Sequence, residues 1–487
     1  MRAYEIGGFM TRCCQLAGET NRTEIEMMKI QSILKFLLAI VSVPFVMTSC
    51  FGDDDAVSLD ETCYISDLSL GTLKREMHTT TAEGKDSVYT LSYTGLSFRM
   101  SIDQKLLLVQ NLDSLPYGTF VDAVPTKLTF SGVAVYKEAD DEDWRTYSTA
   151  DSINFTHPVQ FKIYSATGMS SRTYTVKLNV HKVDGDVFAW NKLEDADVLD
   201  GLKERNLVAL SDKLVMMARK ADGTVFCATR SLLVGGQWTV TPAVGTEGAD
   251  LTTLKKVGGQ MLMSTEAGGL IVSLDGQNWT ELATPVAGRR LIGTSLNYIY
   301  VQTDGVVACS GDGGLTWVEN VLDDTPSNLP DNNVNMHYMQ QDNGSNRLVL
   351  LGNSSASADG KVNVWSKGWR SAASEPSAKW MFYLHTPDNN VLLPQMEPLF
   401  VMPYDGSLIA MGGKTADGSF KALERIYVSP DYGLTWRPSD VLLTPKELYG
   451  ISTPMAVALD KEQFIWVVVG KQTWRARLNR LGFLRQD

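Results

Sequence analysis

The side chains that most often carry out chemistry are few and scattered in this sequence. Its histidines are not spaced as ligands of one metal ion would be; they are His78, His157, His181, His337 and His385. The motifs of a hydrolase nucleophile, a zinc protease, a phosphate-binding loop and a dinucleotide-binding turn are all missing. Local motifs therefore predict no catalytic residue, no metal site and no cofactor.

Paired carboxylates are another route to catalysis, because glycoside hydrolases place two of them around the scissile bond. The chain has 56 Asp and Glu residues, and such a pair would meet only in the folded molecule. The densest acidic run, Glu138–Asp143, lacks the glycine and the spacing of an EF-hand loop. We expect it to be a solvated hairpin tip, with a calcium site as the alternative.

One stretch carries the residue types of a sugar-binding surface. Lys379–Asn390 places Trp380, Tyr383 and His385 close together. Aromatic rings stack on sugar faces, while Asn and Asp side chains bond the hydroxyl groups. These three are candidate ligand-stacking residues. The alternative, which the periodicity favours, is an outer strand whose aromatic side chains pack between sheets.

The composition indicates a folded protein with many strands and turns. The chain is 44% hydrophobic and 21% charged, which excludes a disordered chain and a multi-span membrane protein. The net charge is -12, and no basic stripe is present. We expect no nucleic-acid partner, because binding to phosphates requires clustered Lys and Arg side chains.

Short segments between residues 57 and 184 alternate apolar and polar residues at period two. The clearest of them, Thr173–Val183, puts Tyr174, Val176 and Leu178 on one face together with Val180. The others are Tyr89–Tyr93, Leu96–Ile102, Lys127–Tyr136 and Val159–Ser165. Two packed antiparallel sheets would bury one face of each strand. We predict an Ig-like β-sandwich for residues 57–184.

Three segments further along the chain repeat one motif: Ser273–Trp279, Ser310–Trp317 and Ser429–Trp436. The last two match S-x-D-x-G-x-T-W in full, and the first is one residue short. The motif resembles the Asp-box, or BNR repeat, of sialidase-like β-propellers. The resemblance implies hairpin turns that stabilise the fold and lie away from the ligand-binding face. The structural residues are Ser273, Asp275, Gly276, Trp279, Ser310, Asp312, Gly314, Trp317, Ser429, Asp431, Gly433 and Trp436.

A tryptophan at the start of each outermost strand gives a count of the repeats. The candidates are Trp190, Trp238, Trp279, Trp317, Trp380 and Trp436, about 49 residues apart on average. The last repeat has three strands, within 455–478, and the strand Asp186–Glu194 has no partner of its own. We expect these four strands to form one sheet that closes the ring. The prediction is a six-bladed propeller over residues 185–487, with seven blades as the alternative.

Residues 28–49 have the layout of a signal peptide. Lys29 and Lys35 precede an apolar run of about 12 residues, too short to span a membrane as a helix. Small residues then lead to Cys50, and three aspartates follow at Asp53–Asp55. This order resembles a bacterial lipobox with the acidic tag of Bacteroidetes surface lipoproteins, although Met47 stands where the lipobox usually has Leu.

The lipobox resemblance implies that Cys50 is lipidated and that residues 50–56 form an acidic tether. The protein would then be anchored by lipid in the outer membrane and exposed at the cell surface. The alternative is a solvated linker after an uncleaved signal anchor. Residues 1–27 are too acidic for a signal peptide, so we expect an untranslated or disordered upstream segment.

The complete order of segments, which is lipobox, acidic tag, sandwich and propeller, resembles that of uncharacterised Bacteroidetes lipoproteins with domains of unknown function. No sialidase residue is transferred, because Arg289 and Arg290 precede Leu-Ile-Gly rather than the Ile-Pro of that family. We expect a non-catalytic module whose propeller binds a glycan or a protein. The alternatives are a diverged glycoside hydrolase or lyase with carboxylates in the propeller funnel, and a scaffold of an outer-membrane assembly.

Overall fold

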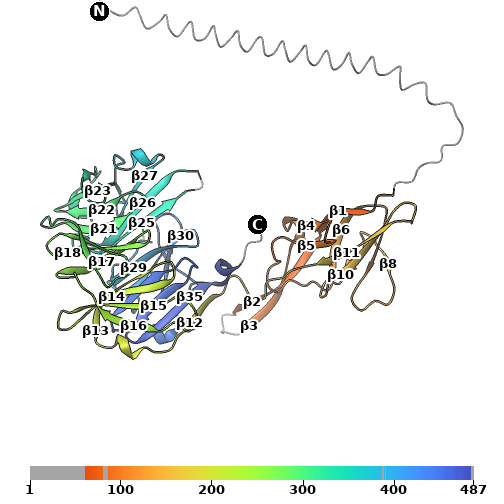
Figure 1. The fold of residues 1–487 in the computed structure, drawn as a ribbon, viewed down its shortest axis with the longest axis horizontal. Helices are drawn as coiled ribbons and strands as arrows, with labels where there is room; N and C mark the ends of the chain where they lie inside the picture. Colours follow the sequence, from red (N-terminus) through yellow and green to blue (C-terminus); the bar gives the residue numbers. More distant parts are fainter. Residues whose placement is uncertain (1–60, 81–85, 342, 387–388, 390, 484–487) are drawn as a thin grey trace, which may run out of the picture. The chain divides into compact units, whose positions relative to one another are not determined.

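The computed structural model describes residues 61–80, 86–341, 343–386, 389 and 391–483 (Figure 1). Regular structure in these residues consists of strands and short 3-10 turns, with no α-helix. The turns are η1 (Gly95–Ser97), η2 (Asp197–Leu199), η3 (Pro326–Asn328), η4 (Ala372–Ser374), η5 (Lys446–Leu448) and η6 (Asn479–Gly482). The all-β fold class is confirmed.

The segments to which we assign the anchor all lie outside the described residues. They are the upstream segment 1–27, the signal peptide 28–49, Cys50 and the tether 50–56. Their assignments remain predictions. In the described part of the chain, no helix is both long enough and apolar enough to cross a membrane.

The first eleven strands form three sheets. One has the order β1 (Tyr64–Leu70), β6 (Val124–Ser131), β9 (Ser152–Ile153). The second has the order β4 (Met100–Asp103), β5 (Leu108–Asn111), β11 (Ser171–Lys177), β10 (Val159–Tyr164), β7 (Val133–Lys137), β8 (Arg145–Thr146). The third is the hairpin of β2 (Thr72–Thr80) and β3 (Asp86–Thr94).

Three of the predicted strands in this region differ from expectation. The predicted strand Lys127–Tyr136 is two strands, β6 and β7, which belong to different sheets and are divided at Gly132 (φ +105°). The other two are shorter than expected. The prediction of a strand over Leu96–Ile102 was wrong at its N-terminal end. The backbone N–H of Leu96 donates to Thr94 Oγ1, and the chain turns through η1 before β4 begins. In the other, β11 ends at Lys177 rather than near Val183. Tyr174 and Val176 are buried as predicted, whereas Leu178 and Val180 are half-buried.

The acidic run Glu138–Asp143 connects the antiparallel strands β7 and β8. Arg145 forms ion pairs with Glu138 at 3.2 Å and with Asp141. No cluster of three or more potential metal ligands exists among the described residues. The prediction of a hairpin tip is confirmed.

Residues 188–478 form six four-stranded antiparallel sheets (Figure 1). Five are consecutive: β13 (Leu202–Ala209), β14 (Lys213–Lys220), β15 (Val225–Ser231), β16 (Trp238–Pro242); β17 (Ala249–Val257), β18 (Gln260–Thr265), β19 (Leu270–Ser273), β20 (Thr280–Ala283); β21 (Arg290–Thr294), β22 (Ile299–Thr303), β23 (Val306–Ser310), β24 (Val318–Glu319); β25 (Asn332–Gln340), β26 (Asn346–Asn353), β27 (Asn363–Trp369), β28 (Met381–Phe382); β29 (Met396–Tyr404), β30 (Ser407–Thr415), β31 (Tyr427–Ser429), β32 (Arg437–Pro438). The sixth has the order β12 (Phe188–Lys192), β35 (Gln472–Leu478), β34 (Ile465–Val469), β33 (Met455–Leu459).

The six sheets stand around a common centre. Their first strands contact one another in the order β13, β17, β21, β25, β29, β33, and β33 contacts β13 again. β12 pairs with β35 in antiparallel fashion, from Phe188 opposite Leu478 to Lys192 opposite Trp474. This confirms the prediction that the strand near residues 186–194 completes the last sheet. Each sheet has an even number of antiparallel strands, so all six first strands begin at the same end of the ring. We call this end the entry end.

The tryptophans used for counting lie where the sequence predicted them, at the outermost strands. Trp238 begins β16, Trp190 lies within β12, and the other four immediately precede β20, β24, β28 and β32. Most of these side chains are buried between neighbouring sheets; for example, Trp436 is in one cluster with Leu408 of its own sheet and Val349 of the neighbouring sheet. This packing holds the short outer strands against the rest of each sheet.

The three repeated segments form turns between the third and fourth strands of their sheets, which we call the box turns. In the third box turn, Asp431 Oδ1 accepts hydrogen bonds from Thr435 N and Ser429 Oγ, each at 2.9 Å, and Asp431 Oδ2 accepts one from Thr435 Oγ1 at 2.6 Å. Gly433 has φ +91° and donates from N to Ser429 Oγ, while its carbonyl accepts from Trp436 Nε1.

The other two box turns have the same arrangement. Asp312 Oδ1 accepts from Thr316 N at 2.9 Å, and Asp275 Oδ1 accepts from Asn278 N at 2.9 Å. Their glycines, Gly314 and Gly276, have φ +95° and +84°. Third strands run parallel to the first strands, so the box turns lie at the end of the ring opposite the entry end.

Candidate functional site

The ring encloses a cavity of about 420 Å³ at its centre. Its walls are the first strands of all six sheets: β13, β17, β21, β25, β29 and β33. We call it the central cavity. A cavity of this volume falls in the range that binds small ligands, roughly 300–1,000 Å³.

Side-chain amides join neighbouring first strands around the central cavity. Asn206 on β13 donates from Nδ2 to the carbonyl of Leu251 on β17 at 2.9 Å. Asn335 on β25 donates to the carbonyl of Leu399 on β29 and accepts from Val401 N, each at 3.2 Å. Adjacent sheets of the ring are not joined by a ladder of backbone hydrogen bonds. The side-chain amides link them instead, and they present polar groups to the cavity.

Four basic residues line the central cavity: Arg205, Lys255, Lys256 and His337. Lys255 Nζ donates to the carbonyl of Val334 at 3.0 Å, which links β17 to β25. Burial lowers the pKa of Lys255 to about 8. Burial, with the charge of Lys255, lowers the pKa of His337 to about 4, so this imidazole is neutral at pH 7. His337 Nε2 is buried without a hydrogen-bond partner in the described structure.

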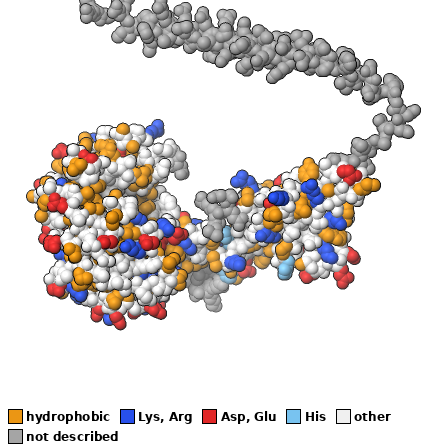
Figure 2. Space-filling view, viewed as in Figure 1, with side chains coloured by type: hydrophobic (Ala, Val, Ile, Leu, Met, Phe, Trp, Pro, Cys, Tyr) orange, Lys and Arg blue, Asp and Glu red, His pale blue; other side chains and the backbone are white. Residues whose placement is uncertain are grey.

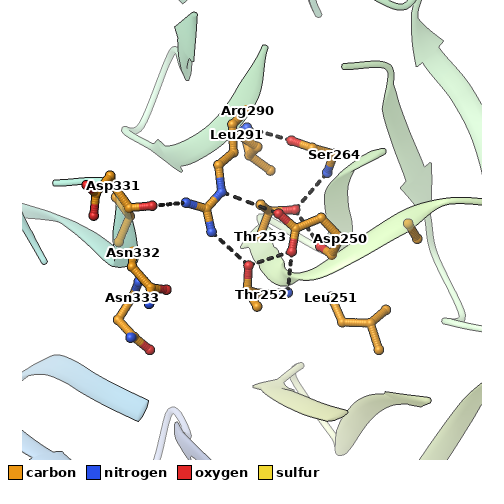
Figure 3. Close-up of polar contacts among 12 residues, drawn as sticks. Asp250, Leu251, Thr252, Thr253, Ser264, Arg290, Leu291, Asp331, Asn332 and Asn333 are labelled. Carbon is orange, nitrogen blue, oxygen red and sulfur yellow. Dashed lines mark hydrogen bonds and ion pairs between the residues drawn. The ribbon is translucent and has the colours of Figure 1, made fainter. Parts of the chain in front are cut away.

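A polar network around the ion pair of Arg290 and Asp250 joins β17 and β21 to Asp331, the residue before β25, near the entry end (Figure 3). Arg290 pairs from Nε with Asp250 Oδ2 at 3.3 Å, and its other nitrogens donate to Thr252 Oγ1 at 2.8 Å and to the carbonyl of Asp331 at 2.9 Å. Arg289 is buried instead and donates from Nε to the carbonyl of Gly268. Both guanidinium groups therefore have protein partners.

Glu204 on β13 is a carboxylate in the neighbourhood of Asp250, which belongs to this network. Glu204 pairs with Arg219 at 2.9 Å. Partial burial raises the pKa of Glu204, while Arg219 opposes this shift and Asp250 adds to it. Neither carboxylate lines the central cavity, and no other Asp or Glu of the described residues does so. The cavity itself therefore lacks the acid and base of a two-carboxylate glycosidase.

The structure contradicts the ligand-stacking role of Trp380. Its side chain is fully buried, Nε1 donates to Asn320 Oδ1 at 3.1 Å, and its ring packs edge-on against Tyr300. A ring enclosed on all sides has no face for a sugar. The alternative reading, aromatic packing between sheets, is confirmed for this residue.

The other two candidate stacking residues are held at the periphery of the ring. Tyr383 is half-buried, and its hydroxyl accepts a hydrogen bond from Arg347 at 3.3 Å. His385 Nδ1 lies 2.9 Å from Asp359 Oδ2. Neither contributes to the central cavity.

Sequence reasoning did not identify the residues that line the central cavity. Asn206, Lys255, His337 and Asn335 are polar residues within the first strands β13, β17 and β25. The available signal was that each lies in the first strand of its repeat. It becomes visible only once the repeats are aligned by strand rather than by the box motif.

Family comparison gives the ring and the N-terminal region their classification. Residues 184–486 match the DUF6242 beta propeller domain, and residues 68–178 match the DUF6242 N-terminal domain, a domain of unknown function. The chain belongs to the DUF6242 family. The expected propeller and the expected membership in a family of unknown function are confirmed.

No curated protein matches the chain. Similar solved structures include the SapL1 lectin in complex with alpha methyl fucoside, with 14% identity, TM-score 0.35, and coverage of 56% of this chain and 92% of the lectin. The Penicillium chrysogenum alpha-L-arabinanase complexed with arabinobiose has 12% identity, TM-score 0.36, and coverage of 59% and 99%. A DUF4623 family protein from Bacteroides eggerthii has 9% identity, TM-score 0.34, and coverage of 84% and 98%. These likenesses are too low to indicate an activity.

Proposed function

We propose that this protein binds a saccharide in the central cavity of a six-bladed propeller and does not cleave it. The observation that carries this proposal is the lining of that cavity. It offers amide, imidazole and ammonium groups together with apolar strand residues, and no carboxylate of the described residues. Such a surface can bond hydroxyl groups and pack against sugar rings, but it supplies no pair of acid and base.

The unpartnered polar atoms in the cavity support a ligand role. His337 Nε2 and Asn333 Nδ2 are buried without partners among the described residues. A buried polar group without a hydrogen bond costs about 1–3 kcal/mol. A ligand hydroxyl that bonded these atoms would recover this free energy, so the site is arranged to favour occupancy.

The remaining features of the proposal concern location. The protein is anchored at the cell surface of a Bacteroidetes bacterium through lipid on Cys50, with an Ig-like sandwich between the anchor and the propeller. Incorporation of labelled palmitate that is lost in Cys50→Ser would support the anchor. Labelling that survives the substitution would reject it.

The binding role is tested by a screen of the purified full chain against a glycan array and a panel of glycosidase substrates. The expected result is binding to a defined set of glycans with no release of product. Product formed from a bound glycan would overturn the non-catalytic role.

A second candidate function is glycoside hydrolysis at the entry end. The observation that favours it is the raised pKa of Glu204 in the neighbourhood of Asp250, since a carboxylic acid with a raised pKa beside a second carboxyl group is the arrangement of a glycosidase. Any activity found in the screen should then be abolished by Glu204→Gln. Activity retained in that variant would contradict this assignment.

A further inference from the structure

A second cavity of about 650 Å³ opens beside the central one, at the entry end. The two cavities share Arg205 and Pro398. The walls of the second cavity come from β13, β29, β30 and β33 and from the segment 450–454. We call it the cationic cleft, and its charged lining residues are Lys203, Arg205, Glu397, Lys414 and Lys421.

The cationic cleft concentrates positive charge that the protein does not neutralise. Four of its charged residues are basic and one is acidic, in a chain with a net charge of -12. In the described structure none of the four basic groups forms an ion pair, whereas Arg219 at the same end pairs with Glu204. Figure 2 shows that acidic and basic side chains are otherwise interspersed on the visible face of the ring.

Arg205 is held in place by neutral groups only. Its guanidinium donates to the carbonyl oxygens of Leu199 and Leu202 at 2.8–2.9 Å and to that of Gly470 at 2.5 Å. These carbonyls fix the guanidinium plane, and the charge of Asp200 acts on Arg205 without forming an ion pair with it. Burial lowers the pKa of Arg205 to about 10, so the group is still cationic at neutral pH.

Neutral donors stand beside the basic groups. Ser452 and Thr453 line the cleft, and their hydroxyls have no hydrogen-bond partner among the described residues. Gly450, with φ +72°, turns the chain so that the stem of Lys421 passes over it, with Cδ 3.4 Å from the position of an added Cβ. The cleft therefore combines fixed positive charge with free hydroxyls, which is the recognition chemistry of an anionic, hydroxylated ligand.

We propose that the cationic cleft binds the acidic group, carboxylate or sulfate, of an acidic saccharide whose neutral part occupies the central cavity. This proposal rests on the proposed saccharide-binding function, and the shared wall residues Arg205 and Pro398 place the two cavities side by side. The charged residues are too few to follow a polynucleotide backbone, so the cleft matches a single anionic group rather than a nucleic acid.

Calorimetry on the purified full chain tests this assignment with three probes of equal length. They are a galacturonic acid tetramer, a sulfated galactose tetramer and a neutral galactose tetramer. We expect one or both acidic tetramers to bind at least about tenfold more tightly than the neutral one, with an advantage that falls as salt rises. The two acidic probes distinguish a carboxylate ligand from a sulfate ligand.

The lysine dependence is tested with the double variant Lys414→Gln/Lys421→Gln. It should remove the preference for the acidic tetramer and leave binding of the neutral tetramer unchanged. Lys379→Gln, an exposed lysine outside both cavities, is the matched control and should retain the preference. Thermal melting of each variant shows that it is folded.

Equal binding of the acidic and neutral tetramers would overturn this inference and leave the saccharide-binding function standing. Binding of no saccharide would overturn both. A hexaglutamate peptide bound as tightly as the acidic tetramers, with the same lysine dependence, would contradict a saccharide ligand.

Discussion

The box turns and the central cavity differ in how far their polar groups are hydrogen-bonded. In a box turn, every oxygen of the aspartate accepts hydrogen bonds from residues within five positions along the chain, as Asp431 does from Ser429 and Thr435. In the central cavity, His337 Nε2 and Asn333 Nδ2 are buried without partners among the described residues. Satisfied polar groups stabilise a fold, whereas unsatisfied ones cost stability unless a ligand bonds them.

This difference separates architecture from function within one ring. The box turns lie opposite the entry end and are complete without a ligand. The central cavity and the cationic cleft, of which the cleft lies at the entry end, both contain polar atoms without hydrogen-bond partners among the described residues. Substitutions in the two regions should therefore have different consequences for stability and for binding.

The largest expected effect comes from removing a box-turn carboxylate. Asp431→Ala deletes the acceptor of three hydrogen bonds and should lower the free energy of unfolding by about 3 kcal/mol. Denaturant unfolding measures the change. The exposed Asp440→Ala is the control and should change the free energy by less than about 0.5 kcal/mol. Equal effects of the two substitutions would show that the box turn is not a stabilising element.

A smaller effect is expected when an amide link between first strands is removed. Asn335→Ala leaves Leu399 O and Val401 N without their side-chain partners and should cost about 2 kcal/mol in unfolding free energy. The exposed Asn297→Ala serves as the control. A neutral result for Asn335→Ala would mean that water replaces the amide and that the ring does not depend on this link.

A pH-dependent effect is expected at His337. Its pKa is lowered from 6.5 to about 4 in the folded state, so between these pH values the unfolded chain binds a proton that the folded chain does not. Stability should therefore fall as the pH drops from 6.5 towards 4, and His337→Asn should reduce this loss by at least about 1 kcal/mol.

Unfolding by urea at a series of pH values in this range checks the prediction. His157→Asn, at an exposed histidine, is the comparison. A slope that is the same in wild type and in His337→Asn would contradict a neutral, buried imidazole.

The smallest effect is expected at the periphery. His385→Ala removes the contact with Asp359 and should change stability by less than about 1 kcal/mol. Glycan binding should be unchanged, because His385 lies outside both cavities. A tenfold loss of affinity would restore this residue to the binding surface and move the site away from the ring centre.

Local patterns were sufficient to predict much of the ring. The box motif encodes a turn within eight residues, and the tryptophans mark strand starts, so both could be read from the sequence. The pairing of β12 with β35 followed from counting strands, since one sheet lacked a strand and one strand lacked a sheet. Local side-chain hydrogen bonds were harder to predict. Thr94 accepts a hydrogen bond from Leu96 N, and β4 therefore begins later in the chain than predicted.

The candidate site could not be predicted because its residues converge from distant parts of the sequence. Lys255 meets Val334 across 79 positions, and Asn206 meets Leu251 across 45. Trp380 illustrates the opposite error, since a cluster of aromatic residues in the sequence does not reveal which face of a strand is enclosed. Three-dimensional closure of the ring decides both outcomes.

The most direct test of the account is to fill the central cavity and measure saccharide binding. Thr294→Trp places a large ring in the cavity wall, and Thr280→Trp places the same ring at an exposed position on β20. Calorimetry with a glycan identified in the array screen should show binding to wild type and to Thr280→Trp, and none to Thr294→Trp. Undiminished binding to a folded Thr294→Trp variant would contradict the central cavity as the ligand site.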